Sequence, residues 1–155
     1  MARARNIKPG IVRNESLAEL PPVYRLGFIF SWMFADCNGV IEFRPKRLKI
    51  DLFPYDPDVD IDDFVRALAK SGFVCPFSVG GRRFIKIVNF VKHQRPHKQE
   101  TDAGSDLPDI DTEGVRVWAK PEELPNYFGM DSEPVALIPD SLISNSLTRK
   151  PTKPF

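Results

Sequence analysis

The dipeptide Gly80-Gly81 constrains the fold of this chain more than any other feature, because an apolar run flanks it on each side. The run before it is FVCPFSV and the run after it is RRFIKIVNF, both rich in β-branched and aromatic residues. Two glycines readily adopt the positive φ angles of the tightest hairpin turns, so the segment predicts an antiparallel β-hairpin. Pro76 lacks the N–H group that a central strand donates, so we expect its strand at a sheet edge.

Three helices and a short strand are expected before the hairpin. A largely buried helix is predicted between Leu20 and Asp36, where apolar side chains face almost every direction and a Pro-Pro pair suits the first turn. The sequence NGVIEF then predicts a turn into a short strand at 40–43. A second, short helix is expected to begin near Pro45 and to end before Pro54.

The third helix has the clearest periodicity, because the apolar residues of DVDIDDFVRALAKSGF recur at helical spacing. Asp60 is its candidate N-cap, and the acidic residues of its first turn suit the positive end of the helix dipole. The order helix, strand, helix, helix, hairpin is that of the winged helix-turn-helix, an α+β fold with three helices and a β-hairpin wing. An unspecified small α+β domain is the alternative.

The distribution of charged residues divides the chain into a basic front part and an acidic back part. Residues 1–100 hold 17 Lys and Arg against 11 Asp and Glu, whereas residues 101–155 hold 5 against 10. We therefore expect a basic N-terminal arm over 1–19, a winged-helix DNA-binding domain over 20–100, and an acidic, proline-rich, largely irregular tail over 101–155. Trp118, Tyr127 and Phe128 form a candidate weakly ordered aromatic patch in that tail.

The basic front half predicts an anionic partner, and DNA is the first candidate. Lys and Arg neutralise phosphates, and the guanidinium group of Arg also reads base edges or a narrow minor groove. The candidate contacts lie on the arm, the second and third helices, the hairpin and the segment after it: Arg3, Arg5, Lys8, Arg44, Lys46, Arg47, Lys49, Arg66, Lys70, Arg82, Arg83, Lys86, Lys92, His93, Arg95 and Lys98.

The third helix does not fit the usual use of this fold, in which that helix enters the major groove. Its first turn holds Asp62 and Asp63 after Asp60, and phosphates would repel them. We therefore expect the second helix and the hairpin to supply most of the affinity, with Arg66 and Lys70 the only helpful charges on the third helix. The alternatives are a protein-interaction module, which would use the acidic helix and the aromatic patch, and a transcription regulator on the same fold.

Metal binding, catalysis and a membrane location are not expected. His93 and His97 have the spacing of helix-borne zinc ligands, but Pro96 between them disfavours that helix. No phosphate-binding loop, calcium loop or nucleophile–base motif is found, so we expect neither an enzyme nor a cofactor. With no apolar span and no secretory signal, the protein is expected in the cytoplasm, with Cys37 and Cys75 as free thiols.

Residues 1–100 resemble the N-terminal domain of phage and prophage replication proteins of the replisome-organiser type. The resemblance rests on MARARNIKPG, LAELPPVYRLGFIFSWMFAD, NGVIEFRPKRLKIDLFPYD, ALAKSGFV and GRRFIKIVNFVKHQRPH. It implies a winged-helix domain that binds DNA, often at a phage origin, followed by a region that engages host replication proteins such as the helicase or its loader. VCPFSVGG departs from the family pattern, and the chain is shorter than the resemblance leads us to expect.

Overall fold

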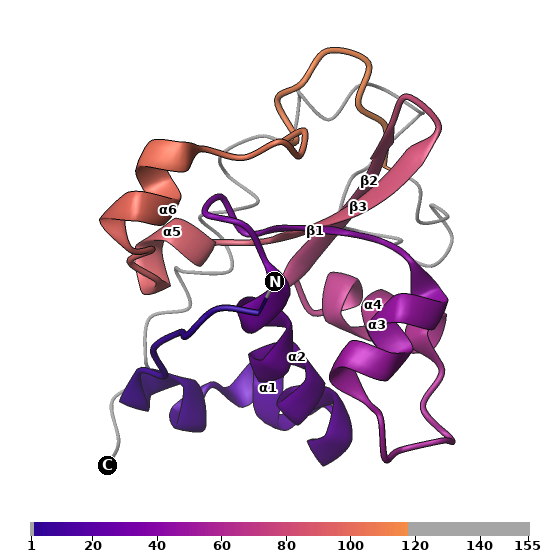
Figure 1. Ribbon diagram of the computed structural model, residues 1–155. Helices are drawn as coiled ribbons and strands as arrows, with labels where there is room; N and C mark the ends of the chain where they lie inside the picture. The colour runs from indigo at the N-terminus through magenta and orange to yellow at the C-terminus, as the bar shows by residue number, and fades with distance from the viewer. Residues whose placement is uncertain (1, 118–155) are drawn as a thin grey trace.

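The structure, a computed structural model, describes residues 2–117, and the predicted patch of Trp118, Tyr127 and Phe128 lies outside them. Helices and a small antiparallel sheet alternate along the chain, which confirms the α+β class (Figure 1). The elements are η1 (Pro9–Arg13), α1 (Glu15–Ala18), α2 (Pro22–Phe34), β1 (Val40–Glu42), α3 (Pro45–Leu52), α4 (Ile61–Lys70), β2 (Val74–Val79), β3 (Arg82–Ile87), α5 (Phe90–His93) and α6 (Lys98–Ala103).

The sheet is built around the predicted hairpin. The strand order is β1-β3-β2 with both pairings antiparallel, so β2, which carries Pro76, is an edge strand as expected. Val79 pairs with Arg82, and the two residues between them, Gly80 and Gly81, have φ angles of 57° and 74°. Those angles are strained for residues with a Cβ atom, which is why two glycines make this turn.

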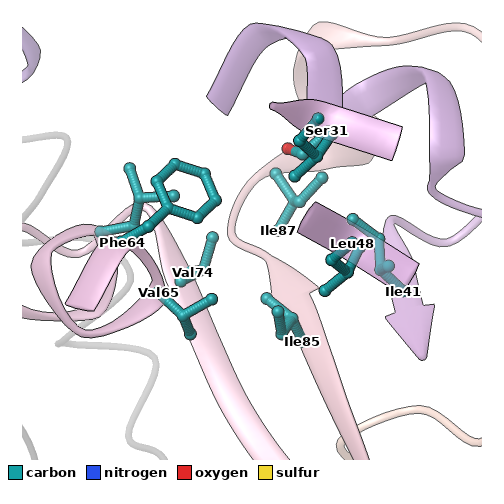
Figure 2. A pocket seen from close by; sticks show the side chains of 10 residues that line it. Ser31, Ile41, Leu48, Phe64, Val65, Val74, Ile85 and Ile87 are labelled. Atoms are coloured by element: carbon teal, nitrogen blue, oxygen red, sulfur yellow. The ribbon is translucent and has the colours of Figure 1, made fainter. Parts of the chain in front are cut away.

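One face of the sheet packs on α2, α3 and α4, and the main core lies between these layers (Figure 1). Aromatic pairs run through it: the ring centroids of Phe53 and Phe64 are 5.0 Å apart, and those of Phe28 and Trp32 are 5.4 Å apart. Figure 2 shows side chains from all these elements around a small hollow inside this core, with the Ser31 hydroxyl as the polar group of its lining. That hydroxyl donates to the Phe28 carbonyl at 2.6 Å, so the hollow offers nothing to hold a charged ligand.

The segment after α6 covers the other face of the sheet. Val115 is 1% exposed and lies in a second cluster with Val40, Cys75, Phe77 and Phe84. The backbone of residue 116 also forms an isolated antiparallel bridge with the outer edge of β2. Residues 104–117 are irregular, as expected for this part of the chain, but they are packed against the sheet.

Predicted element ends agree with the structure where local chemistry sets them. α3 begins at Pro45, and the Asp60 carboxylate caps α4 by accepting from the Asp63 N–H at 2.8 Å. The short helices η1, α1, α5 and α6 were not predicted, because four to six residues are too few to show a periodicity. Pro96 separates α5 from α6, so it breaks the helix between the histidines as expected.

Within residues 2–117, none of the helices is long and apolar enough to cross a membrane.

Candidate nucleic-acid interface

Two arginines from different elements meet on Glu42 at the end of β1. Arg82, at the start of β3, donates from Nε and Nη2 to Glu42 Oε1 at 3.1 and 2.9 Å. Arg44, which precedes α3, places its Nε 3.2 Å from Glu42 Oε2. Both guanidinium groups remain largely exposed, at 53% and 69% of their side-chain surface. Glu42 therefore orients two cations without removing them from solvent.

Arg83 lies on the opposite face of the sheet, because neighbouring side chains of a strand point to opposite faces. Its guanidinium carbon is 4.5 Å from the ring centroid of Phe43, a cation–π contact, and its carbonyl accepts from the Phe43 N–H at 2.8 Å. This is the face on which α3 packs. The basic end of the hairpin thus presents cations on both sides of the sheet.

The first turn of α3 adds Lys46 and Arg47, both exposed. Neither an acidic residue nor a side-chain cap is present at this helix start, so two cations follow Arg44 at the positive end of the dipole. Each cation at the start of a helix lowers the stability of that helix by about 0.3–1 kcal/mol unless an anion lies nearby. Arg47 is offset by Asp51, 3.0 Å away and one turn further along. We call Arg44, Lys46, Arg47, Arg82 and Arg83 the α3–hairpin cluster.

The Glu42 carboxyl group is ionised at neutral pH. Its pKa is held below the ordinary 4.5, first by the hydrogen bond from Arg82 and then by the charge of Arg44, against the opposing effect of partial burial. The cluster with its two acids, Glu42 and Asp51, keeps a net positive charge. That charge suits a phosphate backbone, and the guanidinium groups supply forked donors for its oxygens.

Two lysines predicted as DNA contacts instead hold the fold together. The Lys49 ammonium donates to the carbonyls of Asp56 and Val59, each at 2.5 Å, and so closes the loop between α3 and α4. The Lys86 ammonium lies 2.6 Å from an oxygen of Asp109, with 18% of its side chain exposed. These pairings occupy both ammonium groups, so the prediction of DNA contacts for Lys49 and Lys86 is not supported by their placement.

The arm arginines are also structural. Arg5 donates to the carbonyls of Trp32 and Ala35 at 3.0 and 2.9 Å and forms a two-pronged pair with Glu100, with 4% of its side chain exposed. Arg3 donates to the same Ala35 carbonyl and also pairs with Glu100. Together they satisfy the orphan carbonyls at the C-terminus of α2. The structure places the Arg5 side chain in a buried ion pair with Glu100, so its placement does not support the predicted DNA contact.

On α4, Asp62 and Asp63 are exposed, as the sequence suggested. Arg66 pairs with Asp63 at 2.5 Å, so one of the two helpful charges expected on this helix faces an acid. Lys70 is exposed at the opposite end of α4. The exposed side of α4 is consequently less favourable to phosphates than the α3–hairpin cluster is.

The remaining predicted contacts gather around α5. The Lys8 ammonium donates to the Lys92 carbonyl at 3.3 Å, and both Lys8 and Lys92 lower the pKa of His93 after the larger effect of its partial burial. We call Lys8, Lys92 and His93 the arm–α5 cluster. Arg95 and Lys98 follow it and are exposed. Figure 1 shows α5 and α3 at opposite ends of the sheet, so the basic residues form two groups rather than one.

Other candidate chemistry is limited in the described part of the chain. His93 ends α5 and His97 caps α6, and residues 2–117 contain no group of three or more side chains that could hold a metal. Both thiols are free, as expected, and burial raises the pKa of Cys75 to about 12. At that pKa the Cys75 thiol is unreactive at neutral pH.

Sequence reasoning missed the residues that arrange the cations. Glu42 and Phe43 hold three arginines of the α3–hairpin cluster, and Gln94 fixes the arm by accepting from the Asn6 N–H and donating to the Asn6 carbonyl. A signal was present for Glu42, which is a lone acid at the end of the strand, shortly before the basic sequence RPKRLK. None was present for Gln94, because its partner lies 88 positions away.

Comparison of the chain with protein-family models, with curated proteins and with solved structures gave no match in any of the three.

Proposed function

We propose that this protein is a non-enzymatic, winged-helix DNA-binding protein that contacts the phosphate backbone through the α3–hairpin cluster. The observation that carries the proposal is the convergence of Arg44, Arg82 and Arg83 on the Glu42–Phe43 step, directly before two further cations on α3. These residues come from two elements separated in sequence, and their gathering creates an exposed cationic surface of the kind that binds phosphates.

The arrangement of the elements supports the winged-helix assignment. α2, β1, α3, α4 and the hairpin follow in the order of that fold, and β3 lies between β1 and β2 in the sheet. In this assignment the hairpin is the wing. α4 then corresponds to the helix that enters the major groove in most winged-helix proteins. Because α4 presents acids, the wing and α3 take over the contact, and backbone phosphates rather than base edges dominate it.

A role in initiating phage or prophage replication follows from the resemblance of residues 1–100 alone, and we propose it on that ground. Host helicase or loader proteins are the partners it implies. A second candidate, a protein-interaction module, is favoured by one observation: the exposed acids of α4 lie close in sequence to Tyr55, which is 93% exposed. A basic partner protein would suit that surface.

The proposal is tested by fluorescence anisotropy with duplex and single-stranded DNA over a range of salt. If all five cations meet phosphates, the logarithm of affinity falls against the logarithm of salt with a slope of about −4.5. Binding that ignores salt, or no binding to either DNA form, would refute the proposal.

Single variants identify the contacts. Arg82→Ala and Arg83→Ala should each weaken binding to any DNA sequence, because both residues are exposed at the start of β3. Each lost phosphate contact should reduce the slope by about 1. Arg13→Ala is the matched control, since Arg13 is exposed on η1 outside both clusters and its loss should leave the affinity unchanged.

A further inference from the structure

The outer face of the sheet, the one away from α2, α3 and α4, presents two cations with aromatic rings between them. Arg82, Phe84 and Lys86 are two positions apart on β3, so their side chains leave the same face at intervals of about 7 Å. The guanidinium carbon of Arg82 lies 5.1 Å from the centroid of the Phe84 ring. Phe77, which pairs with Phe84 across the strands, stacks on it with ring centroids 5.4 Å apart and an interplanar angle of 24°.

Stacked rings beside cations are the groups by which proteins hold single-stranded nucleic acid. Bases of any kind stack on aromatic side chains, and the flanking cations meet the backbone phosphates. Packing alone explains the rings but not Lys86, because an ion pair on a covered face adds little or no stability over an apolar residue. The alternation of cation, ring and cation is therefore better explained by a ligand than by the fold.

Segment 104–117, orange in Figure 1, covers this face and places an acid where a phosphate would lie. Both carboxylate oxygens of Asp109 accept from the Lys86 ammonium, at 2.9 and 2.6 Å. The segment as a whole holds four acids against one cation. Its charge has the sign of a nucleic-acid backbone, and its contact with Lys86 is the contact that a phosphate would make.

The segment is attached to the rest of the domain near its two ends. At its start, the Ser105 hydroxyl donates to the Asp36 carboxylate. At its end, Ser78 and Arg116 exchange two backbone hydrogen bonds, at 2.6 and 2.8 Å. Within the described chain, no backbone group of residues 106–114 hydrogen-bonds to the sheet, so the ion pair with β3 is the polar link over that length. A segment with so few ties opens at a lower free energy than the strands beneath it.

We propose that the outer face is a second nucleic-acid site, which takes single-stranded DNA, and that segment 104–117 closes it as an autoinhibitory strap. Once the strap has moved away, bases stack on the two rings and a backbone phosphate takes the place of Asp109 on Lys86. In the closed form Lys86 is occupied, as its placement shows. The site goes beyond the proposed function, and Arg82 is the residue that it shares with the α3–hairpin cluster.

The test compares two full-chain variants, Asp109→Asn and Asp111→Asn, for binding to a labelled thymidine oligonucleotide of about 12 nucleotides. Each variant removes one negative charge from the strap. Asp109 is paired with Lys86, whereas Asp111 is exposed and forms no ion pair with a described residue. Asp109→Asn should bind the oligonucleotide about tenfold more tightly than the wild type, because the closed form loses its polar link. Asp111→Asn should change the affinity by less than about twofold.

Hydrogen exchange of the wild-type protein gives a second readout, which does not depend on how a variant folds. In the free protein the Ser78 and Arg116 amides donate to each other's carbonyls. Saturation with the oligonucleotide should make both amides exchange about tenfold faster, because the strap has left the edge of β2. The amides that join β1 to β3 should keep their protection.

Equal affinities of the two variants for the oligonucleotide would overturn the strap, and so would unchanged protection of the Arg116 amide in the complex. Duplex DNA, which meets the α3–hairpin cluster, is titrated in parallel and should bind both variants alike. A protein that binds duplex DNA but shows neither effect therefore refutes the second site and leaves the proposed function standing. Failure of every variant and of the wild type to bind either DNA form would overturn both.

Discussion

At the scale of single residues, Glu42 sets how much positive charge the α3–hairpin cluster presents to a ligand. Its carboxylate orients Arg44 and Arg82 but also competes with a phosphate for their donors. Glu42→Gln keeps an acceptor for Arg82 and removes the negative charge. DNA affinity should therefore rise by about fivefold, or roughly 1 kcal/mol, in a fluorescence titration at low salt. A fall in affinity would show that orientation by Glu42 matters more than its charge.

The contacts of individual side chains were the features least predictable from the sequence. Arg5 and Arg83 look alike in the sequence, as basic residues in basic segments. In the structure one is a buried cap on α2 and the other an exposed cation over Phe43. The difference is made by partners such as Glu100, 95 positions from Arg5, and no local pattern encodes such a distance.

At the scale of elements, the arm, the end of α2 and α6 are tied by the pair of Arg5 and Glu100. The pKa of Glu100 is lowered from 4.5, mainly by the hydrogen bond from Arg5 and then by its charge, so the pair stabilises the fold above that pH. This stabilisation is lost as pH falls through the lowered value. Glu100→Gln should reduce the free energy of unfolding at pH 7 by about 3 kcal/mol in urea denaturation.

The same variant should flatten the loss of stability between about pH 5 and pH 3, because the titrating group is gone. Glu113→Gln is the control, since Glu113 is exposed and makes no ion pair with a described residue. Equal stability of the two variants would contradict the role given to the pair.

Elements whose ends are set locally were predictable. Pro45 starts α3, Asp60 caps α4, and Gly80 with Gly81 turns the hairpin, each through chemistry within a few residues. The four short helices were not, because tertiary contacts rather than a repeating pattern stabilise them. α5, for example, is held by the burial of Phe90 at 2% exposure.

At the scale of the whole molecule, the sheet is covered on both faces, and the outer cover is the irregular segment 104–117. Val115 lies over Cys75 and Phe77, and a charge there would be buried. Val115→Asp should lower the free energy of unfolding by about 3 kcal/mol. It should also raise the rate of Cys75 alkylation, followed by mass spectrometry, at least about tenfold.

The control for this experiment is Arg116→Asp, which places the same side chain at the neighbouring exposed position. Its alkylation rate and stability should stay close to those of the wild type. A Val115→Asp variant that alkylates no faster than the control would show that segment 104–117 does not protect the outer face. The sequence suggested only an acidic tail here, because a single buried valine gives no pattern to detect.

The most direct measurement of the central claim is a backbone amide NMR titration of the protein with duplex DNA. The account predicts that the largest shifts fall at Arg44, Lys46 and Arg47 and around the turn from Gly80 to Arg83, while Asp62 and Asp63 of α4 change little. Shifts centred on the first turn of α4, or none at all, would contradict DNA binding through α3 and the hairpin.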